Sequence, residues 1–336
     1  MKAPRSIILK DATLREGLDT PDVFFSPAQR RVIARLLERT GVREAEVVAP
    51  SRVFSDLDIA RNLKQDGVSM RLSGLIYAYS SSCAREIKAS SGTLDRFDLL
   101  MPASPERAPK EPRKKFRLLM VAVKQAAERK ADFGVGFPHC FQSDAELVRK
   151  MAEEAERAGA QRVTLYDTNG SQDPSEVRQF VRQIKKAVDV PVFFHGHNDL
   201  GMATANSLAA VQAGADGLDV TVNGLGDRAG NAALEQVAAA LHLKGYGTGI
   251  WLKNLKELCD RVAEQSGLGI AKLAPVVGEY VCYHRSPSHL SNPSLFEAFD
   301  PSQFRATRKL AESAPREKAS KPGAPSPSGE ERLTRK

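Results

Sequence analysis

The chain has 336 residues, of which 42% are hydrophobic and 27% charged, and its formal net charge at pH 7 is +8. This composition is typical of a globular enzyme, and the length fits one large α/β barrel with an appended subdomain. No run approaches the roughly 18–20 apolar residues of a membrane helix, residues 1–5 lack a signal-peptide core, and the four cysteines form no C-x-x-C pair. We therefore expect a cytoplasmic protein with reduced thiols and no membrane partner.

The basic excess raises the question of nucleic acid. Arginines and lysines are not interleaved with aromatic residues on any predicted folded element, as a nucleic-acid surface would require. Anionic small substrates account equally well for the charge. We expect small-molecule substrates and no nucleic-acid partner.

Eight short β-rich runs alternate along the chain with eight amphipathic runs whose apolar spacing is near 3.6 residues. The predicted strands are residues 7–9, 45–48, 72–78, 97–101, 132–137, 162–166, 192–195 and 217–222. The predicted helices are residues 27–39, 56–65, 82–89, 112–130, 144–158, 174–188, 202–213 and 231–244. Strict alternation predicts a parallel sheet, and eight units in about 240 residues favour a closed (β/α)₈ TIM barrel over the alternative, an open doubly wound sheet.

The pattern changes after residue 248. Residues 251–266 read as a helix, 270–277 as a connector, and 278–300 are rich in Ser, Pro, His and aromatic residues. Beyond these, Lys, Pro, Ser, Gly and Glu dominate, which is typical of disorder. We expect a catalytic barrel over residues 1–248, a small helical subdomain over 249–305 and a disordered basic tail over 306–336.

Polar residues stand at the ends of several predicted strands, where the active site of such a barrel lies. In His195-Gly196-His197 the two imidazoles fall on the same side of an extended chain and can serve as metal ligands; hydrogen-bonded structural histidines are the alternative. Barrel closure places strand 8 between strands 7 and 1, so Asn231 and Glu16 could converge on them. Two nitrogen and two oxygen ligands would leave positions for water or substrate.

Arg15 precedes Glu16 at the end of strand 1. A cation there could stabilise a developing enolate or carboxylate oxygen. The alternative is an ion pair with Asp11 or Glu16.

Three segments together resemble a known family. Residues 11–17 resemble the D-x-T-L-R-[DE]-G motif of the isopropylmalate/homocitrate synthase family, residues 195–206 its H-x-H-N-D-x-G-x-A-x-A-N signature, and residues 221–231 its T-x-N-G-x-G-[DE]-R-A-G-N segment. The resemblance covers roughly residues 6–290. It extends to the wider superfamily of metal-dependent lyases with a TIM barrel, which includes 3-hydroxy-3-methylglutaryl-CoA lyase.

The resemblance implies a divalent cation (Mg²⁺, Mn²⁺, Zn²⁺ or Co²⁺) held by Glu16, His195, His197 and Asn231. It implies that Arg15 polarises the substrate carbonyl and steadies the enolate. The implied reaction is a Claisen-type condensation of acetyl-CoA with a 2-oxo acid, of the homocitrate, citramalate, isopropylmalate or phosphonomethylmalate type. The enzyme class is an acyltransferase that converts the acyl group into an alkyl group on transfer.

Further roles follow from the same resemblance. Thr168 would bind the carboxylate of the 2-oxo acid, Asp11 would orient Arg15, and Asp199 would support the site from behind. Residues 278–289 are similar to the family segment G-E-x-x-F-x-H-x-S-G-x-H, whose last histidine is an acid/base that often reaches the partner subunit's active site.

That similarity implies a catalytic His289, supported by His284 and Glu279, in a homodimer. Two positions of the segment depart from the motif, so a purely structural loop is the alternative.

Other departures concern the substrate. Residues 136–142 lack the S-x-E-D-x-x-R run of synthases and resemble the G-C-P-Y stretch of lyases; we hypothesise that His139 supplies the missing acid/base function. Asp19 stands where the family has Gln, and Arg107 where His is common, and both would line the substrate pocket. An extra arginine favours a doubly anionic substrate, such as a dicarboxylate or phosphonate. The alternative functions are a metal-dependent carbon–carbon lyase and a non-catalytic binding barrel.

Overall fold

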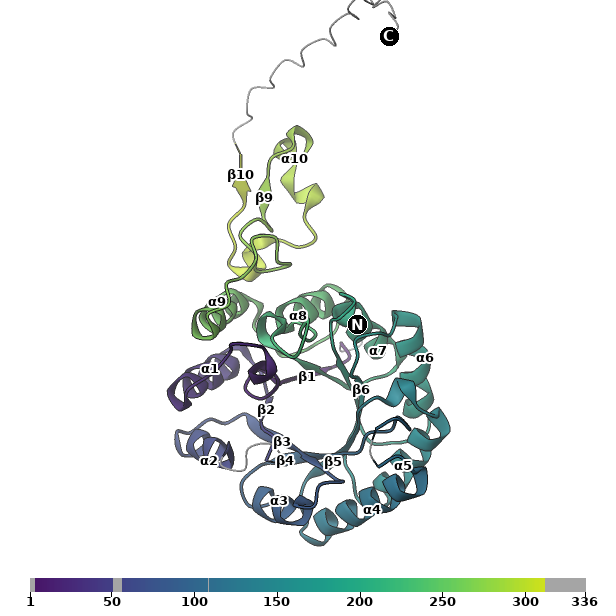
Figure 1. Cartoon of the computed structure of the whole chain (residues 1–336). Helices are drawn as coiled ribbons and strands as arrows, with labels where there is room; N and C mark the ends of the chain where they lie inside the picture. The colour runs from purple at the N-terminus through teal and green to yellow at the C-terminus, as the bar shows by residue number, and fades with distance from the viewer. Residues whose placement is uncertain (1–3, 51–55, 108, 312–336) are drawn as a thin grey trace, which may run out of the picture.

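The computed structural model describes residues 4–50, 56–107 and 109–311. Eight parallel strands form a closed barrel in which β1 pairs with both β2 and β8 (Figure 1). The strands are Ile8–Asp11 (β1), Glu44–Val48 (β2), Arg71–Tyr77 (β3), Arg96–Leu100 (β4), Phe133–Phe137 (β5), Val163–Asp167 (β6), Val192–Gly196 (β7) and Gly217–Val220 (β8). The predicted (β/α)₈ barrel is confirmed.

Helices surround the barrel as the alternation predicts (Figure 1). They are Pro27–Thr40 (α1), Leu57–Gln65 (α2), Cys83–Ser90 (α3), Pro112–Glu128 (α4), Ala145–Arg157 (α5), Pro174–Lys185 (α6), Ala203–Ala213 (α7) and Leu234–Leu243 (α8). Local chemistry sets several of their ends. Ser26 and Asp173 each form a capping box with the third residue of their helix. A proline follows each of them at the first helical position, where a backbone N–H would have no partner within the helix.

The segment between β8 and α8 differs from the prediction. The strand stops at Val220, Val222–Gly224 (η4) forms a 3₁₀ turn with Asn223 at φ 57°, and the helix begins only at Leu234. Asn231 makes an isolated bridge to His197, and Ala233 makes one to Thr221. These bridges hold residues 231–233 extended although Ala232 and Ala233 have the highest helix propensity of any residue type.

The barrel interior contains buried charged side chains. Lys10, Asp98 and Arg162 are fully buried, in positions that branched apolar residues fill in most barrels of this type. The apolar core lies instead between the strands and the helices, with Ile33 and Val135 among its members.

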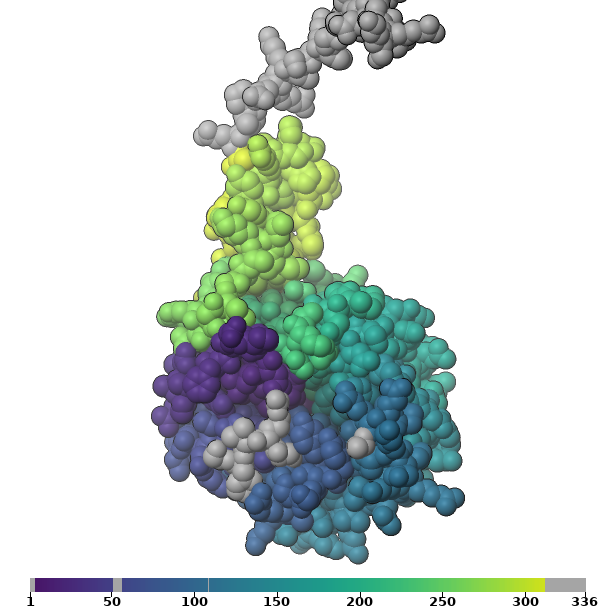
Figure 2. Space-filling view, in the orientation of Figure 1, coloured from purple at the N-terminus to yellow at the C-terminus, as the bar shows by residue number. Residues whose placement is uncertain are grey.

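A C-terminal subdomain follows the barrel. Leu255–Ser266 (α9) packs beside α1, and the chain continues through Tyr283–His284 (β9), Pro287–Ser291 (α10) and Lys309–Leu310 (β10). β9 and β10 pair in parallel, so pairing continues past the predicted boundary at residue 305; residues 312–336 of the predicted tail lie outside the described residues. The subdomain stands away from the barrel beyond α9 (Figures 1 and 2). None of the described helices is long and apolar enough to cross a membrane.

Candidate metal centre and catalytic cavity

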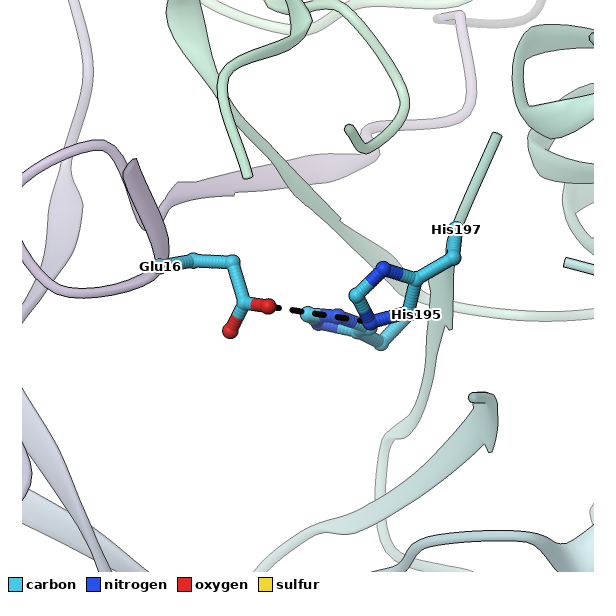
Figure 3. Close-up of side chains that lie close together, drawn as sticks. All are labelled: Glu16, His195 and His197. Carbon is cyan, nitrogen blue, oxygen red and sulfur yellow. Dashed lines mark ion pairs between the residues drawn. The ribbon is translucent and has the colours of Figure 1, made fainter. Parts of the chain in front are cut away.

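Three separate chain segments bring metal-ligand types together at the carboxyl end of the barrel. Glu16 opens the 3₁₀ turn Glu16–Asp19 (η1) after β1, His195 lies in β7, and His197 follows it. The carboxylate of Glu16 points toward the two imidazoles (Figure 3), and one ligand atom from each residue lies within 4.8 Å of the others. Asn231, held by its bridge to His197, places Nδ2 3.0 Å from His195 Nε2.

The donor set fits a divalent cation. Burial, followed by the neighbouring His195, lowers the pKa of His197 to about 2, so its imidazole is in the neutral form that binds metals. Asp219 Oδ2 lies 3.1 Å from His195 Nδ1; when it accepts that N–H, the lone pair of Nε2 faces the cluster. Asn231 Oδ1 is buried and has no hydrogen-bond partner among the described residues, and rotation of the amide can present it to a cation.

Arg15 is fixed beside this cluster. Its Nε and Nη2 donate to Glu46 Oε1 at 2.6 and 2.5 Å, and its Nη1 pairs with Glu16. Asp11 instead accepts hydrogen bonds from Thr13 N and Oγ1, and burial raises its pKa to about 7. The support for Arg15 that was predicted for Asp11 is therefore provided by Glu46.

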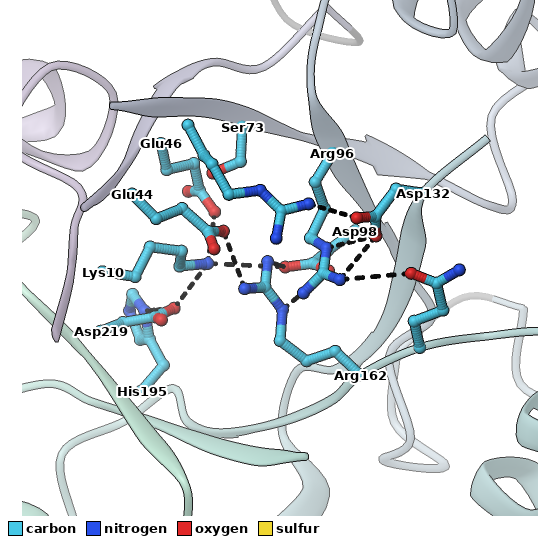
Figure 4. Close-up of polar contacts among 12 residues, drawn as sticks. Lys10, Glu44, Glu46, Ser73, Arg96, Asp98, Asp132, Arg162, His195 and Asp219 are labelled. Carbon is cyan, nitrogen blue, oxygen red and sulfur yellow. Dashed lines mark hydrogen bonds and ion pairs between the residues drawn. The ribbon is translucent and has the colours of Figure 1, made fainter. Parts of the chain in front are cut away.

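Behind the site lies a group of buried charges, the interior charge network, which consists of Lys10, Glu44, Glu46, Asp98, Arg162 and Asp219 (Figure 4). Lys10 Nζ lies 2.8 Å from Glu46, 3.1 Å from Asp219 and 3.5 Å from Asp98. Burial would lower the pKa of Lys10, but these carboxylates hold it well above its usual value. Lys10 thus contacts both Asp219, which lies beside His195, and Glu46, which binds Arg15.

The charges of this assembly do not balance. With Arg15 and its partners Glu16 and Asp19 included, three cations (Lys10, Arg15, Arg162) face six carboxylates (Glu16, Asp19, Glu44, Glu46, Asp98, Asp219). Buried charge is costly unless it is compensated. A bound dication would compensate most of this excess negative charge.

A cavity of about 510 Å³ opens onto the cluster, and Arg15, Glu16, His195 and His197 line it. Four further predicted site residues line the same cavity: Asp19, Arg107 and Thr168, predicted to bind substrate, and His139, predicted as an acid/base. Thr168 Oγ1 accepts the backbone N–H of His139 at 2.8 Å, so its own hydroxyl hydrogen remains free to donate. Burial and then the nearby Arg107 lower the pKa of His139.

The other predicted site residues lie elsewhere. Asp199 pairs with Arg228 at 2.7 Å at the cavity rim. In the subdomain, Glu279 pairs with Lys272, and His289 contacts His284, with 3.4 Å between their Nδ1 atoms. None of these three subdomain residues predicted for the site lines the cavity of the same chain.

Sequence reasoning missed the supporting residues Glu46, Asp219 and Lys10, and also Arg228 and Tyr166, which line the cavity. A signal for the first three was present: charges lie within predicted strands or at their edges, such as Glu44 and Glu46 in E-A-E-V-V. Alternate positions in a strand share a face, so such charges mark a polar barrel interior.

The comparisons agree with this architecture. The family model described as HMGL-like matches residues 6–262. The chain belongs to the HMGL-like family. It is 34% identical over 320 residues to homocitrate synthase of Methanopyrus kandleri, and the aligned region covers 92% of this chain and 80% of that protein. It is also 32% identical to 2-isopropylmalate synthase 2 of Caldanaerobacter subterraneus, over 92% of this chain and 82% of that protein. The predicted resemblance is confirmed.

Solved structures show the same fold for this HMGL-like chain. HMG-CoA lyase of Bacillus subtilis superposes with a TM-score of 0.69 at 21% identity, over 80% of this chain and 96% of that one. The carboxyl transferase domain of Rhizobium etli pyruvate carboxylase gives a TM-score of 0.64 at 18% identity, over 80% of this chain and 50% of that one. At these identities the likeness concerns architecture alone.

Proposed function

We propose that the chain catalyses the metal-dependent condensation of acetyl-CoA with a 2-oxo acid. The observation that carries this proposal is the ligand cluster of Glu16, His195 and His197 beside Arg15 in one cavity. Relatives named homocitrate, 2-isopropylmalate and (R)-citramalate synthase, 30–34% identical, support it.

Glu16, His195, His197 and Asn231 would hold the cation, and their mixed nitrogen and oxygen donors suit Mg²⁺, Mn²⁺, Zn²⁺ or Co²⁺. The cation supplies Lewis acidity and a template for the 2-oxo acid. Asp219 fixes the ring of His195 from behind, as such ligands require.

Arg15 presents a guanidinium, held by Glu46, to the oxygen on which charge develops. A methyl C–H bond of acetyl-CoA breaks and its proton passes to a base. The methyl carbon then bonds to C2 of the 2-oxo acid, whose ketone oxygen takes up a proton. Water cleaves the thioester and releases the CoA thiol.

His139 is our proposal for the base. Its lowered pKa leaves the imidazole neutral near pH 7, and it lines the cavity. Thr168, with its hydroxyl hydrogen free, would bind the carboxylate of the 2-oxo acid. Asp19 and Arg107 would contact the rest of that substrate; Arg107 makes no ion pair within the described ranges, which favours a second anionic group.

We further propose a homodimer, in which the barrel (residues 1–248) of one chain receives the subdomain (249–305) of the other. Large apolar side chains are exposed on the subdomain and β10, where contiguous apolar surface marks an interface. They are Trp251, Leu268, Leu273, Tyr280, Val281, Tyr283, Leu295, Phe296 and Leu310. Such a dimer would let His289, with His284 and Glu279 behind it, reach the partner's cavity. A cytoplasmic location is part of the proposal, which the free, buried cysteines support.

The test is thiol release from acetyl-CoA with pyruvate, oxaloacetate, 2-oxoglutarate, 2-oxoisovalerate and phosphonopyruvate, with Mn²⁺ or with EDTA. We expect release with one acid, abolished by EDTA and by Glu16→Ala but not by Glu257→Ala, an exposed control carboxylate. No release from protein that binds Mn²⁺ would contradict the proposal. Cleavage of a 3-hydroxyacyl-CoA by the same protein would then establish the lyase alternative.

A further inference from the structure

A cavity of about 540 Å³ lies outside the catalytic site, where α9 meets the rest of the subdomain (Figure 1). Three chain segments line it: α9, the connector of residues 270–282, and residues 304–309, which run into β10. None of its described lining residues lines the catalytic cavity. We call it the junction cavity; its size falls within the roughly 300–1,000 Å³ typical of small-molecule sites.

The buried part of the lining is apolar. Val277, Cys282 and Phe304 are 3%, 5% and 2% exposed. Ala263 of α9 and Ile270 of the connector add partly buried apolar side chains. This lining favours a ligand with a hydrocarbon body, because removal of apolar surface from water stabilises the complex.

The exposed part of the lining carries two positive charges without a local partner. Its acids, Asp260 and Glu279, each pair with a lysine of their own segment. The side chains of Arg305 and Lys309 are exposed and make no ion pair with any residue in the ranges that the structure describes. Lysine and arginine bind carboxylates through charge-assisted hydrogen bonds, so these two cations favour an anionic group on the ligand.

The connector contains a strained turn beside the cavity. The N–H of Val277 donates to Pro275 O at 2.8 Å and closes a three-residue γ-turn around Val276, which has φ 69°. This form of the γ-turn is rare, and a β-branched side chain is disfavoured in it. Arg305, in another lining segment, also has a positive φ, of 54°. Residues strained in this way cluster at ligand sites, where the surrounding structure holds them.

Backbone contacts hold the lining segments together. Gly278 N donates to Ala274 O at 3.0 Å, and a Cβ at Gly278 would lie 2.5 Å from that oxygen, so the connector requires a glycine here. Lys309 N donates to Cys282 O at 2.9 Å and joins the third segment to the connector. The junction cavity is therefore formed by the fold before any ligand binds.

We propose that the junction cavity binds a small carboxylate with a hydrocarbon body. The carboxylate pairs with Arg305 and Lys309, and the body packs against Val277, Cys282 and Phe304. Because α9 packs beside α1, the bound ligand would link the outer part of the subdomain to the helix that rests on the barrel. This inference is independent of the proposed function, since no residue of the catalytic cavity takes part in it.

The experiment measures binding of hexanoate, 4-methylpentanoate and phenylacetate to the full chain by calorimetry, each beside its neutral amide. Acetate provides the charge without the hydrocarbon body. The variant Arg305→Gln with Lys309→Gln removes the two unpaired cations. Its matched control, Arg129→Gln with Lys253→Gln, removes an exposed arginine and an exposed lysine that do not line the cavity. Circular dichroism and the melting temperature verify that both fold.

A second variant and a second measurement locate the ligand. Ala263→Phe introduces a large side chain into the apolar lining from α9. Hydrogen exchange, followed by mass spectrometry, compares the free and ligand-bound protein. The bound carboxylate should slow exchange in residues 270–282 and 304–309, which form two of the three lining segments.

We expect at least one of these carboxylates to bind the wild type about 10-fold more tightly than its amide, and acetate not to bind. The Arg305/Lys309 variant should bind that carboxylate about 10-fold more weakly and lose the preference over the amide. The Arg129/Lys253 control should bind it like the wild type. Ala263→Phe should weaken binding of the carboxylate and the amide alike.

The proposal would be overturned if no carboxylate with a hydrocarbon body bound the wild type, or if carboxylate and amide bound equally. An equal loss in the Arg129/Lys253 control, or slowed exchange confined to other parts of the chain, would also contradict it. None of these outcomes bears on the metal-dependent condensation, because none of the changed residues lines the catalytic cavity.

Discussion

At the scale of single residues, Lys10 is the side chain on which both halves of the candidate site depend. Its ammonium is shared by Glu46, which holds Arg15, and Asp219, which holds His195. Removing one partner from a buried ion pair leaves uncompensated charge and costs about 3–5 kcal/mol. We therefore expect Lys10→Met, which keeps the length of the side chain, to lower the free energy of unfolding by that amount in urea denaturation.

Arg71→Met is the control for this prediction. Arg71 pairs with Asp132, and the two side chains are 46% and 26% exposed, so solvent screens the pair. The expected loss is about 1 kcal/mol. Equal losses in the two variants would contradict the central place of Lys10 in the interior charge network.

The candidate ligands could be predicted from the sequence, and their supports could not. Glu16, His195 and Asn231 lie at or after the carboxyl ends of predicted strands, where barrels of this type have their active sites. Residue type and position in the sequence were therefore sufficient to predict them as ligands. Lys10 and Asp219 lie inside strands, and a charge there can face the barrel interior or the helices. Only the register of β1 against β8, which places them opposite each other, decides this.

At the scale of elements, β5 is the strand that makes room for the charged interior. Its sequence F-G-V-G-F turns large residues toward the helices and glycines inward. A Cβ at Gly134 would lie 2.2 Å from Asp98 Oδ1 and 3.1 Å from the carbonyl oxygen of Arg162. We expect Gly134→Ala to displace the Asp98–Arg162 pair and to destabilise the protein by at least about 1–3 kcal/mol, measured as a shift of the urea midpoint.

Gly92→Ala is the matched control, because a Cβ there meets nothing within 4 Å. Its free energy of unfolding should change by less than about 0.5 kcal/mol. If both alanine variants behave alike, the glycine of β5 does not serve this packing.

The elements themselves follow from hydrophobic periodicity, but one boundary does not. The residues Asn231, Ala232 and Ala233 suit a helix, and the helix was predicted to start there. Bridges to His197 and Thr221 hold this stretch extended. The bridge that positions the candidate ligand Asn231 therefore overrides the local helix propensity. Such a tertiary contact cannot be predicted from the local sequence pattern.

At the scale of the whole molecule, the subdomain leaves large apolar side chains uncovered by the described residues of its own chain. It exposes large apolar side chains such as Leu273 and Leu295, and its His289 does not line the cavity of the same chain. Sequence similarity could suggest His289 as a catalytic group, but a single chain cannot show which cavity it serves. A two-fold symmetric dimer would bring each subdomain to the partner's barrel.

Mixed dimers test this arrangement. Glu16→Ala and His289→Ala chains, each expected to be inactive alone, are co-expressed with different tags, and the doubly tagged dimer is purified. If each cavity combines Glu16 of one chain with the partner's His289, one of the two cavities in the mixed dimer is intact and the other carries both changes. Thiol release should then return to about half that of the wild type, because the two sites of a symmetric dimer are equivalent. If His289 serves its own chain, every cavity in the mixed dimer lacks one group and activity stays absent; a monomeric wild type in sedimentation would contradict the dimer directly.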